Sequence, residues 1–342
     1  MSPAPGATER VSLSAVLPLK VTGRHYGDNL ARLDVLFSSL LRFAPAGLFD
    51  ELLIVVRADE AELIGRHLQS WPELPLRVVL EDEHFPAFRR FTRPWQVRPW
   101  QRQQIIKLNA PALTPASFVL ALDPDVIAVK PVTRELLLPG GRALLEPEAR
   151  SAHRRWWRDS ADLLDANPGL ERPGMSATPA LLASAVLGEV HRRLEEVGGR
   201  PWMDVLLTSY CDWTEYTLYL LAAERAALVE SHHVWADDAA APAHLQVDPA
   251  LSIWDASRAS RPNVERLFTA DDPGLFALVQ SHAGLPAAEV AEVAADHFPV
   301  RETSSAPLSA PGGRSRLGEH IRTASRLAAQ GVYRLRGGAR RR

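Results

Sequence analysis

The sequence predicts an α/β fold built on a mostly parallel, Rossmann-type sheet that is flanked by helices. Short apolar runs without period-two alternation, typical of strands buried on both faces, alternate with segments of helical period along the first part of the chain. The connections between them are short, which favours right-handed crossovers between parallel strands. One apolar run, Phe118–Leu122, is followed at once by acidic residues, at the position where open α/β sheets bind their ligands.

The first elements follow a small, proline-rich segment, residues 1–10, that we expect to be disordered. The predicted elements are a buried strand Leu13–Leu19 ending at Lys20, a helix Leu30–Phe43 capped by Asp28 or Asn29, a strand Leu52–Val56 followed by Asp59, a short helix around Glu60–Gln69, and a strand Leu76–Leu80 ending in Glu81 and Asp82. This alternation of strands and helices predicts a parallel sheet.

Residues 84–101 interrupt the alternation with aromatic side chains, prolines and arginines, and we interpret them as a loop. Aromatic and guanidinium groups suit stacking on a base and pairing with phosphate. Packing of a long loop onto its own domain would explain the aromatics equally well. A helix Arg102–Ala112 is predicted next, with Ile105 and Ile106 towards the core and Gln103, Gln104 and Lys107 together on another face.

Asp123 and Asp125 follow the strand at Phe118–Leu122, separated by Pro124 and succeeded by a second apolar run, Val126–Val129. Carboxylate oxygens at the carboxyl end of a central strand suit Mg²⁺ or Mn²⁺ carrying a diphosphate. An ordinary turn is the alternative, since Asp-Pro-Asp is also good turn chemistry.

The second half of the chain is less regular. Residues 132–174 lack a clear period. The predicted elements are a helix beginning near Ser176 or Thr178 and ended by Gly198 and Gly199, a helix capped by Thr214 or Asp212 with Glu215 in its first turn, a short strand Val229–Val234, a last strand Leu275–Leu285 ending in Ser281 and His282, and a helix Pro286–Phe298.

The composition is that of an ordinary soluble globular protein, with 342 residues of which 46% are hydrophobic and 23% charged. Neither a signal peptide nor an apolar run long enough to cross a bilayer is recognisable, so we expect a cytoplasmic protein. The single cysteine, Cys211, allows no internal disulfide and no thiolate zinc cluster. We expect it to be a small buried hydrophobic side chain, with a cysteine nucleophile as the alternative.

The formal charge of −2 hides a basic C-terminal tail, since residues 313–342 contain nine Arg and one Glu. A Ser/Pro/Gly-rich linker precedes this helix-like tail, and linker and tail together span residues 299–342. Such a tail attracts phosphates, for example on an anionic membrane surface, which would make the protein peripheral to the cell membrane. A solvated tail is the alternative, and we expect no specific nucleic-acid binding.

Several common catalytic motifs are missing from the sequence, namely the nucleophile elbow G-x-S-x-G, the Walker A loop, the zinc motif H-E-x-x-H and the dinucleotide fingerprint G-x-G-x-x-G. A Rossmann-like chain without a glycine fingerprint is not expected to be a dinucleotide dehydrogenase or a P-loop enzyme. A sheet with an Asp-x-Asp pair at a strand end remains.

Three blocks of the chain resemble the GT-A glycosyltransferases, and more closely a bacterial glycosyltransferase-like family of unknown function. They are Trp100-Gln101-Arg102-Gln103-Gln104-Ile105-Ile106-Lys107-Leu108, Leu122-Asp123-Pro124-Asp125-Val126, and Thr214-Glu215-Tyr216-Thr217-Leu218-Tyr219. The resemblance covers roughly residues 12–285. It implies a GT-A-like domain at residues 11–298, with a nucleotide-sugar-binding half at 11–131 and an acceptor half with irregular insertions at 132–298.

The resemblance also implies roles for individual residues. Asp123 and Asp125 would hold Mn²⁺ or Mg²⁺ against the donor diphosphate, with His282 as a third ligand. The residues implied in donor binding are Lys20, Asp59, Asp82, Arg102, Gln103, Gln104, Lys107 and Asp123. Glu215 would be the general base of an inverting enzyme, with Asp212 and then Asp204 as the alternatives. In a retaining enzyme, Glu215 would instead hold the acceptor or the donor sugar.

These expectations combine into a metal-dependent glycosyltransferase that uses a nucleotide-sugar and a glycan or lipid-linked acceptor, such as a bacterial surface polysaccharide. One alternative is a sugar-phosphate nucleotidyltransferase, although Leu17–Gly27 is a poor version of the glycine-rich loop that such enzymes carry after the first strand. The other alternative is a non-catalytic protein that has the same fold and binds nucleotides or glycans.

Overall fold

The computed structural model describes residues 11–23, 26–90, 99–239 and 241–303. The predictions made for residues 1–10, for the aromatic segment at 91–98, and for the basic tail and most of its linker lie outside the described residues.

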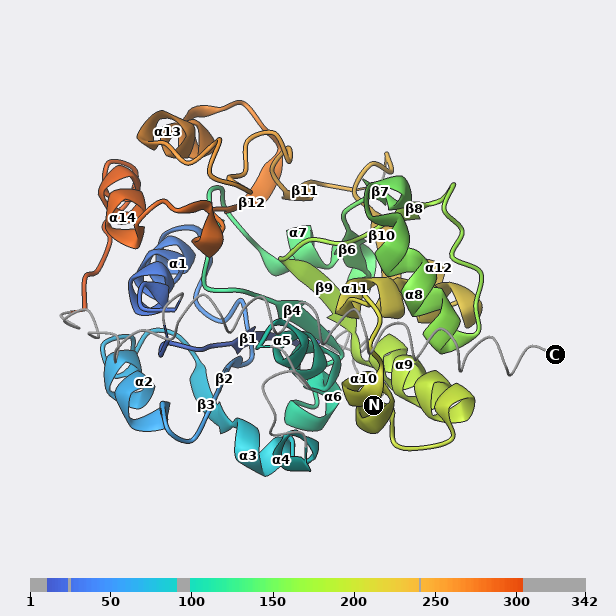
Figure 1. The fold of residues 1–342 in the computed structure, drawn as a ribbon. Coiled ribbons are helices and arrows are strands. Elements are labelled where there is room, and N and C mark those ends of the chain that lie inside the picture. Colours follow the sequence, from blue (N-terminus) through green and yellow to red (C-terminus); the bar gives the residue numbers. More distant parts are fainter. Residues whose placement is uncertain (1–10, 24–25, 91–98, 240, 304–342) are drawn as a thin grey trace, which may run out of the picture.

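A five-stranded sheet in the order β3-β2-β1-β4-β9 lies at the centre of the described chain (Figure 1). Its strands are β1 (Leu13–Pro18), β2 (Leu52–Val56), β3 (Leu76–Leu80), β4 (Phe118–Ala121) and β9 (Ala180–Ala183). The first four are parallel to one another, and β9 runs antiparallel to β4. All residues of β1, β2, β4 and β9 are buried, as expected for apolar runs without alternation.

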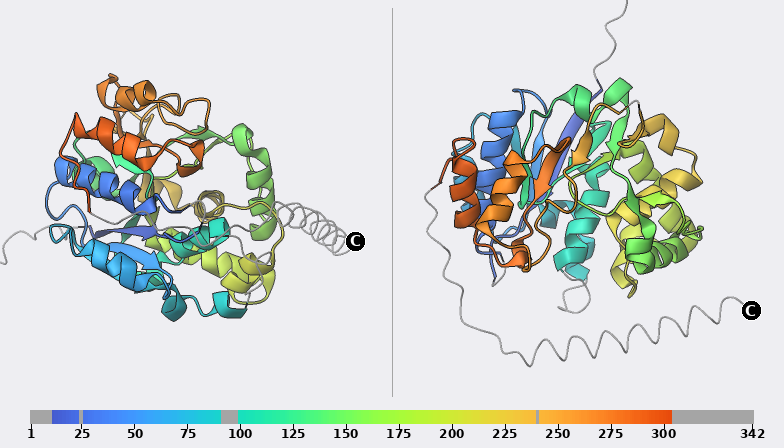
Figure 2. Two further views of the ribbon diagram at one scale, coloured as in Figure 1. Left: turned by 60° about the vertical axis from the view of Figure 1, so that its left-hand side comes forward. Right: turned by 90° about the horizontal axis from the view of Figure 1, so that it is seen from above.

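Helices cover the sheet in two groups that lie on opposite sides of the molecule (Figure 2). In one group, α1 (Asn29–Phe43) packs against α14 (Ala287–Ala295). In the other, α11 (Glu215–Arg225) packs against α8 (Arg154–Leu164) and α9 (Ser184–Gly198). The remaining α-helices are α2 (Ala61–Leu68), α3 (Glu81–His84), α4 (Ala87–Arg90), α5 (Pro99–Leu108), α6 (Ala110–Leu113), α7 (Arg134–Leu137), α10 (Trp202–Thr208), α12 (Val229–His232) and α13 (Arg261–Thr269).

Smaller sheets extend the fold around the central one. A three-stranded sheet joins β11 (His244–Gln246), β12 (Gly274–Leu278) and β5 (Val126–Ala128), and it brings Asp125 next to the segment that follows β12. The other strands are β6 (Ala143–Leu145), which pairs with β10 (His233–Trp235), and β7 (Glu148–Ala149), which pairs with β8 (Pro173–Gly174). Three short 3-10 helices are η1 (Pro139–Gly141), η2 (Arg150–His153) and η3 (Ser281–Ala283).

The predicted α/β class with a mostly parallel sheet flanked by helices is confirmed. The strands at 52–56 and 76–80 have the predicted bounds, and β1 and α1 differ from prediction by a single residue at one end. Asp28 occupies the predicted cap position of α1, but its side chain makes no capping hydrogen bond. The second apolar run, Val126–Val129, contains the strand β5 (Val126–Ala128).

The predicted helix beginning at Ser176 or Thr178 is wrong for its first turns. Residues 180–183 form β9, and the helix begins only at Ser184. Pairing with β4 decides this local structure, because the edge of β4 offers unpaired backbone groups that Ala180–Ala183 satisfies.

Four other predictions need correction. The expected loop at 84–101 contains the short helix α4, in which Phe88 is buried and stacks on Phe85 with ring centroids 5.1 Å apart, so these two rings pack within the protein. The irregular stretch 132–174 contains α8. The expected strand at 229–234 begins as α12, and the last strand, β12, ends at Leu278.

The predicted helix at 102–112 is divided into α5 and α6, with Asn109 between them. No helix among the described residues is both long enough and apolar enough to cross a membrane.

Candidate functional site

A cleft of about 1130 Å³ opens where β4 ends and the chain turns towards β5. It is larger than the usual small-molecule site, and its walls combine apolar and polar side chains. Segments far apart in the sequence contribute to it: residues 26–32, helix α5, Asp123 to Asp125, residues 175–181, the start of α11, and residues 278–282. The cleft therefore lies at the carboxyl edge of the parallel sheet, as the sequence predicts.

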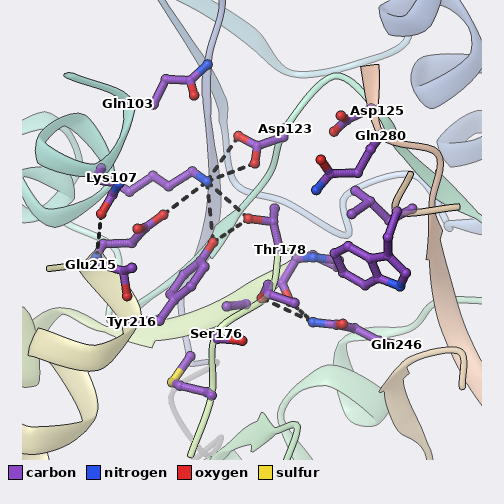
Figure 3. Close-up of a pocket in the computed structure, with 18 of the residues that line it drawn as sticks. Gln103, Lys107, Asp123, Asp125, Ser176, Thr178, Glu215, Tyr216, Gln246 and Gln280 are labelled. Atoms are coloured by element: carbon purple, nitrogen blue, oxygen red, sulfur yellow. Dashed lines mark hydrogen bonds and ion pairs between the residues drawn. The ribbon is translucent and has the colours of Figure 1, made fainter. Parts of the chain in front are cut away.

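Lys107 lies at the centre of the polar groups in this cleft (Figure 3). Its Nζ is 3.0 Å from Asp123 Oδ1 and 3.3 Å from Glu215 Oε1. The same ammonium donates to Thr178 Oγ1 at 3.1 Å and to Tyr216 OH at 3.4 Å. One buried cation on α5 thus contacts three other segments of the chain, at Asp123, at Thr178, and at Tyr216 with the predicted base Glu215.

Helices α5 and α11 are joined next to these charges by a hydrogen bond between a side chain of α5 and the backbone of α11. On α5, Gln104 and Lys107 are one turn apart and both buried. Gln104 Oε1 accepts a hydrogen bond of 3.1 Å from the backbone N–H of Glu215. Thr214 and Thr217 form a capping box that fixes the first turn of α11, so Glu215 is held at a helix N-terminus as predicted.

The charges in the cleft shift one another's protonation. Burial alone would lower the pKa of Lys107, but Asp123, Tyr216 and Glu215 raise that pKa well above its usual value. Burial raises the pKa of Glu215, while the charge of Lys107 opposes that rise. Lys107 therefore stays protonated and favours the ionised form of the buried Glu215 carboxyl.

Asp125, the second residue of the Asp-x-Asp pair, contacts the segment that follows β12. Its Oδ2 accepts a hydrogen bond of 3.0 Å from the backbone N–H of Ser281. Burial, together with the charge of Asp123, raises the pKa of Asp125 to about 6. The two carboxylates of the pair thus differ in their surroundings, since Asp123 contacts the Lys107 ammonium and Asp125 is buried beside the Ser281 backbone.

A divalent cation fits this pair in its donor chemistry, since both side chains offer hard oxygen ligands. Within the described ranges, no three His, Cys, Asp or Glu side chains are close enough together to hold a metal ion. His282 lines the same cleft, and its role as a third ligand stays a prediction. A cation held here would take its remaining ligands from substrate or water.

The structure brings together Gln103, Gln104, Lys107, Asp123, Asp125, Glu215 and His282 in the lining of the cleft. Lys20 does not line the cleft, but its Nζ lies 4.5 Å from the ring centre of Tyr26, which does. The donor-binding roles of all these side chains stay predictions.

Other predicted site residues lie away from the cleft and pair with neighbouring charges. Asp59 bonds Arg57 at 2.7 Å, Asp82 is 3.9 Å from Arg89, and Arg102 bonds Glu81 at 3.1 Å. The two alternative bases behave likewise, since Asp212 is 3.0 Å from Arg155 and Asp204 contacts Arg90. None of these five is among the residues that line the cleft.

Sequence reasoning missed Thr178 and the function of Tyr216. Their hydroxyl oxygens are 2.6 Å apart, and both contact Lys107. Gln246 holds the segment that carries Thr178, because its Nε2 donates to the carbonyls of Ala177 and Pro179 at 3.1 and 3.0 Å. Tyr216 was part of a quoted motif, whereas nothing local to Thr178 or Gln246 indicated a site.

Residues 10–302 match the model of a family of unknown function, DUF6492. The chain belongs to this family. The matched range contains the whole central sheet and all the residues that line the cleft. No curated protein matches the sequence significantly.

Among solved structures, the DUF6492 chain is similar to mouse xyloside xylosyltransferase 1 in its apo form, at 14% identity and a TM-score of 0.42, with 77% of this chain and 96% of that chain covered. It is also similar to 4-diphosphocytidyl-2C-methyl-D-erythritol synthase from Anaerococcus prevotii, at 15% identity and a TM-score of 0.24, with 40% and 55% covered. At these values, neither similarity identifies an activity for this chain.

Proposed function

We propose that this protein is a metal-dependent glycosyltransferase of the GT-A type, which transfers a sugar from a nucleotide-sugar donor to a glycan or lipid-linked acceptor. The observation that carries the proposal is the convergence of Asp123, Asp125, Lys107 and Glu215 at the carboxyl edge of a parallel sheet, in one cleft. This is where such sheets bind nucleotides, and the pair of carboxylates provides the oxygen ligands that a diphosphate-bound cation needs.

On the donor side, Asp123 and Asp125 would hold Mn²⁺ or Mg²⁺. The cation would stabilise the negative charge that develops on the departing nucleoside diphosphate. Burial and, after it, the charge of Asp123 raise the pKa of Asp125 to about 6, and the positive charge of a bound cation would favour the ionised form of this carboxyl. Gln103 lines the cleft on the same helix as Lys107 and can donate its amide N–H to donor oxygens.

On the acceptor side, Glu215 would accept the proton of the attacking hydroxyl. The acceptor oxygen forms a bond to the anomeric carbon as the bond from that carbon to the diphosphate oxygen breaks, and the nucleoside diphosphate leaves with the electron pair. Gln104 supports such a site, because its buried Nε2 has no hydrogen-bond partner among the described residues, beside the backbone of Glu215. A substrate oxygen would satisfy that donor.

A panel of nucleoside diphosphates and nucleotide-sugars, each with and without Mn²⁺, tests the donor side by thermal shift. We expect one nucleoside diphosphate to raise the unfolding temperature in the presence of Mn²⁺, and Asp125→Ala to lose that rise. The change at Asp125 should also abolish transfer, because it removes a cation ligand. Stabilisation without Mn²⁺ that is equal in Asp125→Ala would contradict the metal role.

The products separate this proposal from its alternatives. A glycosyltransferase releases a nucleoside diphosphate from the nucleotide-sugar, whereas a nucleotidyltransferase forms or consumes pyrophosphate. Mn²⁺-dependent stabilisation with no turnover of any donor would instead indicate a binding protein.

A further inference from the structure

Aromatic side chains form one wall of the cleft, and the proposed donor chemistry does not use them. Trp100 on α5, His153 in η2 and Trp156 on α8 all line the cleft. The rings of His153 and Trp156 are stacked, with centroids 4.1 Å apart and planes 10° apart. Trp100 lies beside them, 6.1 Å from Trp156 between centroids. We call these three side chains the aromatic wall.

Trp100 is the exposed member of the aromatic wall, whereas His153 and Trp156 are half-buried. Trp100 is 40% exposed, and among the large hydrophobic side chains of the described residues that are this exposed, it alone lines the cleft. Water on an indole face is unfavourable, so a ligand that covers the face would gain free energy.

Polar groups adjoin the aromatic wall. Glu148 lies 3.4 Å from His153 Nε2 and accepts a hydrogen bond from the Ser176 hydroxyl, and both Glu148 and Ser176 line the cleft. Gln103 also lines it, one helical turn from Trp100. A pyranose ring has an apolar C–H face and hydroxyl groups around its edge, so it matches this mixture. A lipid chain matches it less well, because a lipid chain offers no hydrogen-bonding groups to the polar side chains beside the aromatic wall.

The helix relates the aromatic wall to the reacting groups. Trp100, Gln103 and Lys107 follow helical spacing on α5 and line the same cleft. With the usual rise per residue, Trp100 lies about 10 Å along the axis from Lys107. A sugar ring bound on Trp100 is therefore a different ring from the one whose hydroxyl would react near Glu215.

We propose that Trp100, Trp156, His153 and Glu148 form a carbohydrate subsite that binds a pyranose ring of the acceptor, next to the sugar unit that reacts. The word acceptor rests on the proposed glycosyltransferase function, whereas carbohydrate binding at the aromatic wall does not.

Saturation-transfer NMR on the full chain tests the subsite without donor or metal. The probes are methyl glycosides of glucose, galactose, mannose and xylose, together with maltose and lactose. We expect at least one probe to bind, with the strongest transfer to its ring C–H protons. Trp100→Ala should weaken binding by about tenfold, the upper range for one aromatic contact, and Trp100→Phe should retain most of it.

Tyr210→Ala is the matched control, because Tyr210 is 36% exposed and lies outside the cleft. Its binding should equal that of the unchanged protein. Should Trp100→Ala fail to fold, Glu148→Gln is the second variant, and we expect it to weaken binding as well.

The proposal is overturned if no probe binds, if Trp100→Ala binds as well as the unchanged protein, or if only the methyl glycosides bind and the transfer goes mainly to their methyl protons. Sugar binding without any response to nucleoside diphosphates would leave the subsite standing and remove the glycosyltransferase proposal. A donor response without sugar binding would do the reverse.

Discussion

At the scale of single residues, Lys107 determines what the carboxylates around it can do. A buried lysine loses its charge unless anions surround it, and here Asp123 and Glu215 supply them. Sequence reasoning predicted that Lys107 would share a polar helix face with Gln103. It did not predict that the ammonium joins Asp123 to Glu215, because those contacts connect residues from separate segments of the chain.

Replacing Glu215 by Gln tests the proposed base. We expect transfer to fall by roughly 10²–10⁴-fold, the usual contribution of a general base. The fold should survive because Lys107 keeps Asp123 as its counter-ion. Asp212→Asn is the matched control and should remain active, since Asp212 pairs with Arg155 outside the cleft. Release of nucleoside diphosphate in the presence of acceptor measures both, and full activity of Glu215→Gln would move the base elsewhere.

At the scale of elements, the site depends on where α11 begins. Thr214 Oγ1 accepts from the backbone N–H of Thr217 at 3.1 Å, and Thr217 Oγ1 accepts from the backbone N–H of Thr214 at 3.2 Å. These bonds stop the helix from fraying at Glu215. The cap was predictable because it is encoded by neighbouring residues. The strand β9 was not, since Ala180–Ala183 could equally begin a helix, and its pairing with β4 decides.

Thr214→Ala should therefore affect both stability and catalysis. Loss of the cap costs about 1 kcal/mol, which lowers the unfolding temperature by roughly 1–2 °C in a protein of 342 residues. Transfer should fall as well, because the first turn no longer fixes Glu215. Thr214→Ser keeps the hydroxyl and should restore both readouts. Thermal unfolding and initial rates measure the effects, and equal losses in the two variants would argue against the cap.

At the scale of the whole molecule, two hydrophobic clusters meet at β5. The larger one surrounds the central sheet, and the second lies among α13, α14, β5 and β12. Because Val126 belongs to the first cluster and Ile127 to the second, β5 connects them directly after Asp125. The packing of both clusters thus fixes where the acidic pair lies.

The basic tail adds a prediction about the full chain. Deleting residues 313–342 removes nine Arg, so binding to vesicles that contain anionic lipid should weaken strongly, by up to about 1 kcal/mol per residue near the surface. Donor hydrolysis should persist, since the proposed reacting groups lie far from the tail in sequence. Cosedimentation at low and high salt measures binding, with neutral vesicles as the control. Unchanged binding to anionic vesicles after the deletion would disprove the membrane role.

The sequence by itself determined the parallel strands β1 to β4 and the acidic pair that follows them. Local patterns of apolar residues predict buried strands and where they end. The position of Asp123 and Asp125 at the end of a strand follows from that pattern alone. The position of Glu215 at the start of a helix could likewise be predicted from neighbouring residues.

Only the tertiary structure decided which of these groups meet. It brings Lys107 between Asp123 and Glu215, adds Thr178 through the antiparallel strand β9, and leaves Asp59, Asp82 and Asp212 outside the cleft. The physical reason is that such contacts join segments far apart in the chain. Their geometry depends on how sheet and helices pack, which no local pattern of residues records.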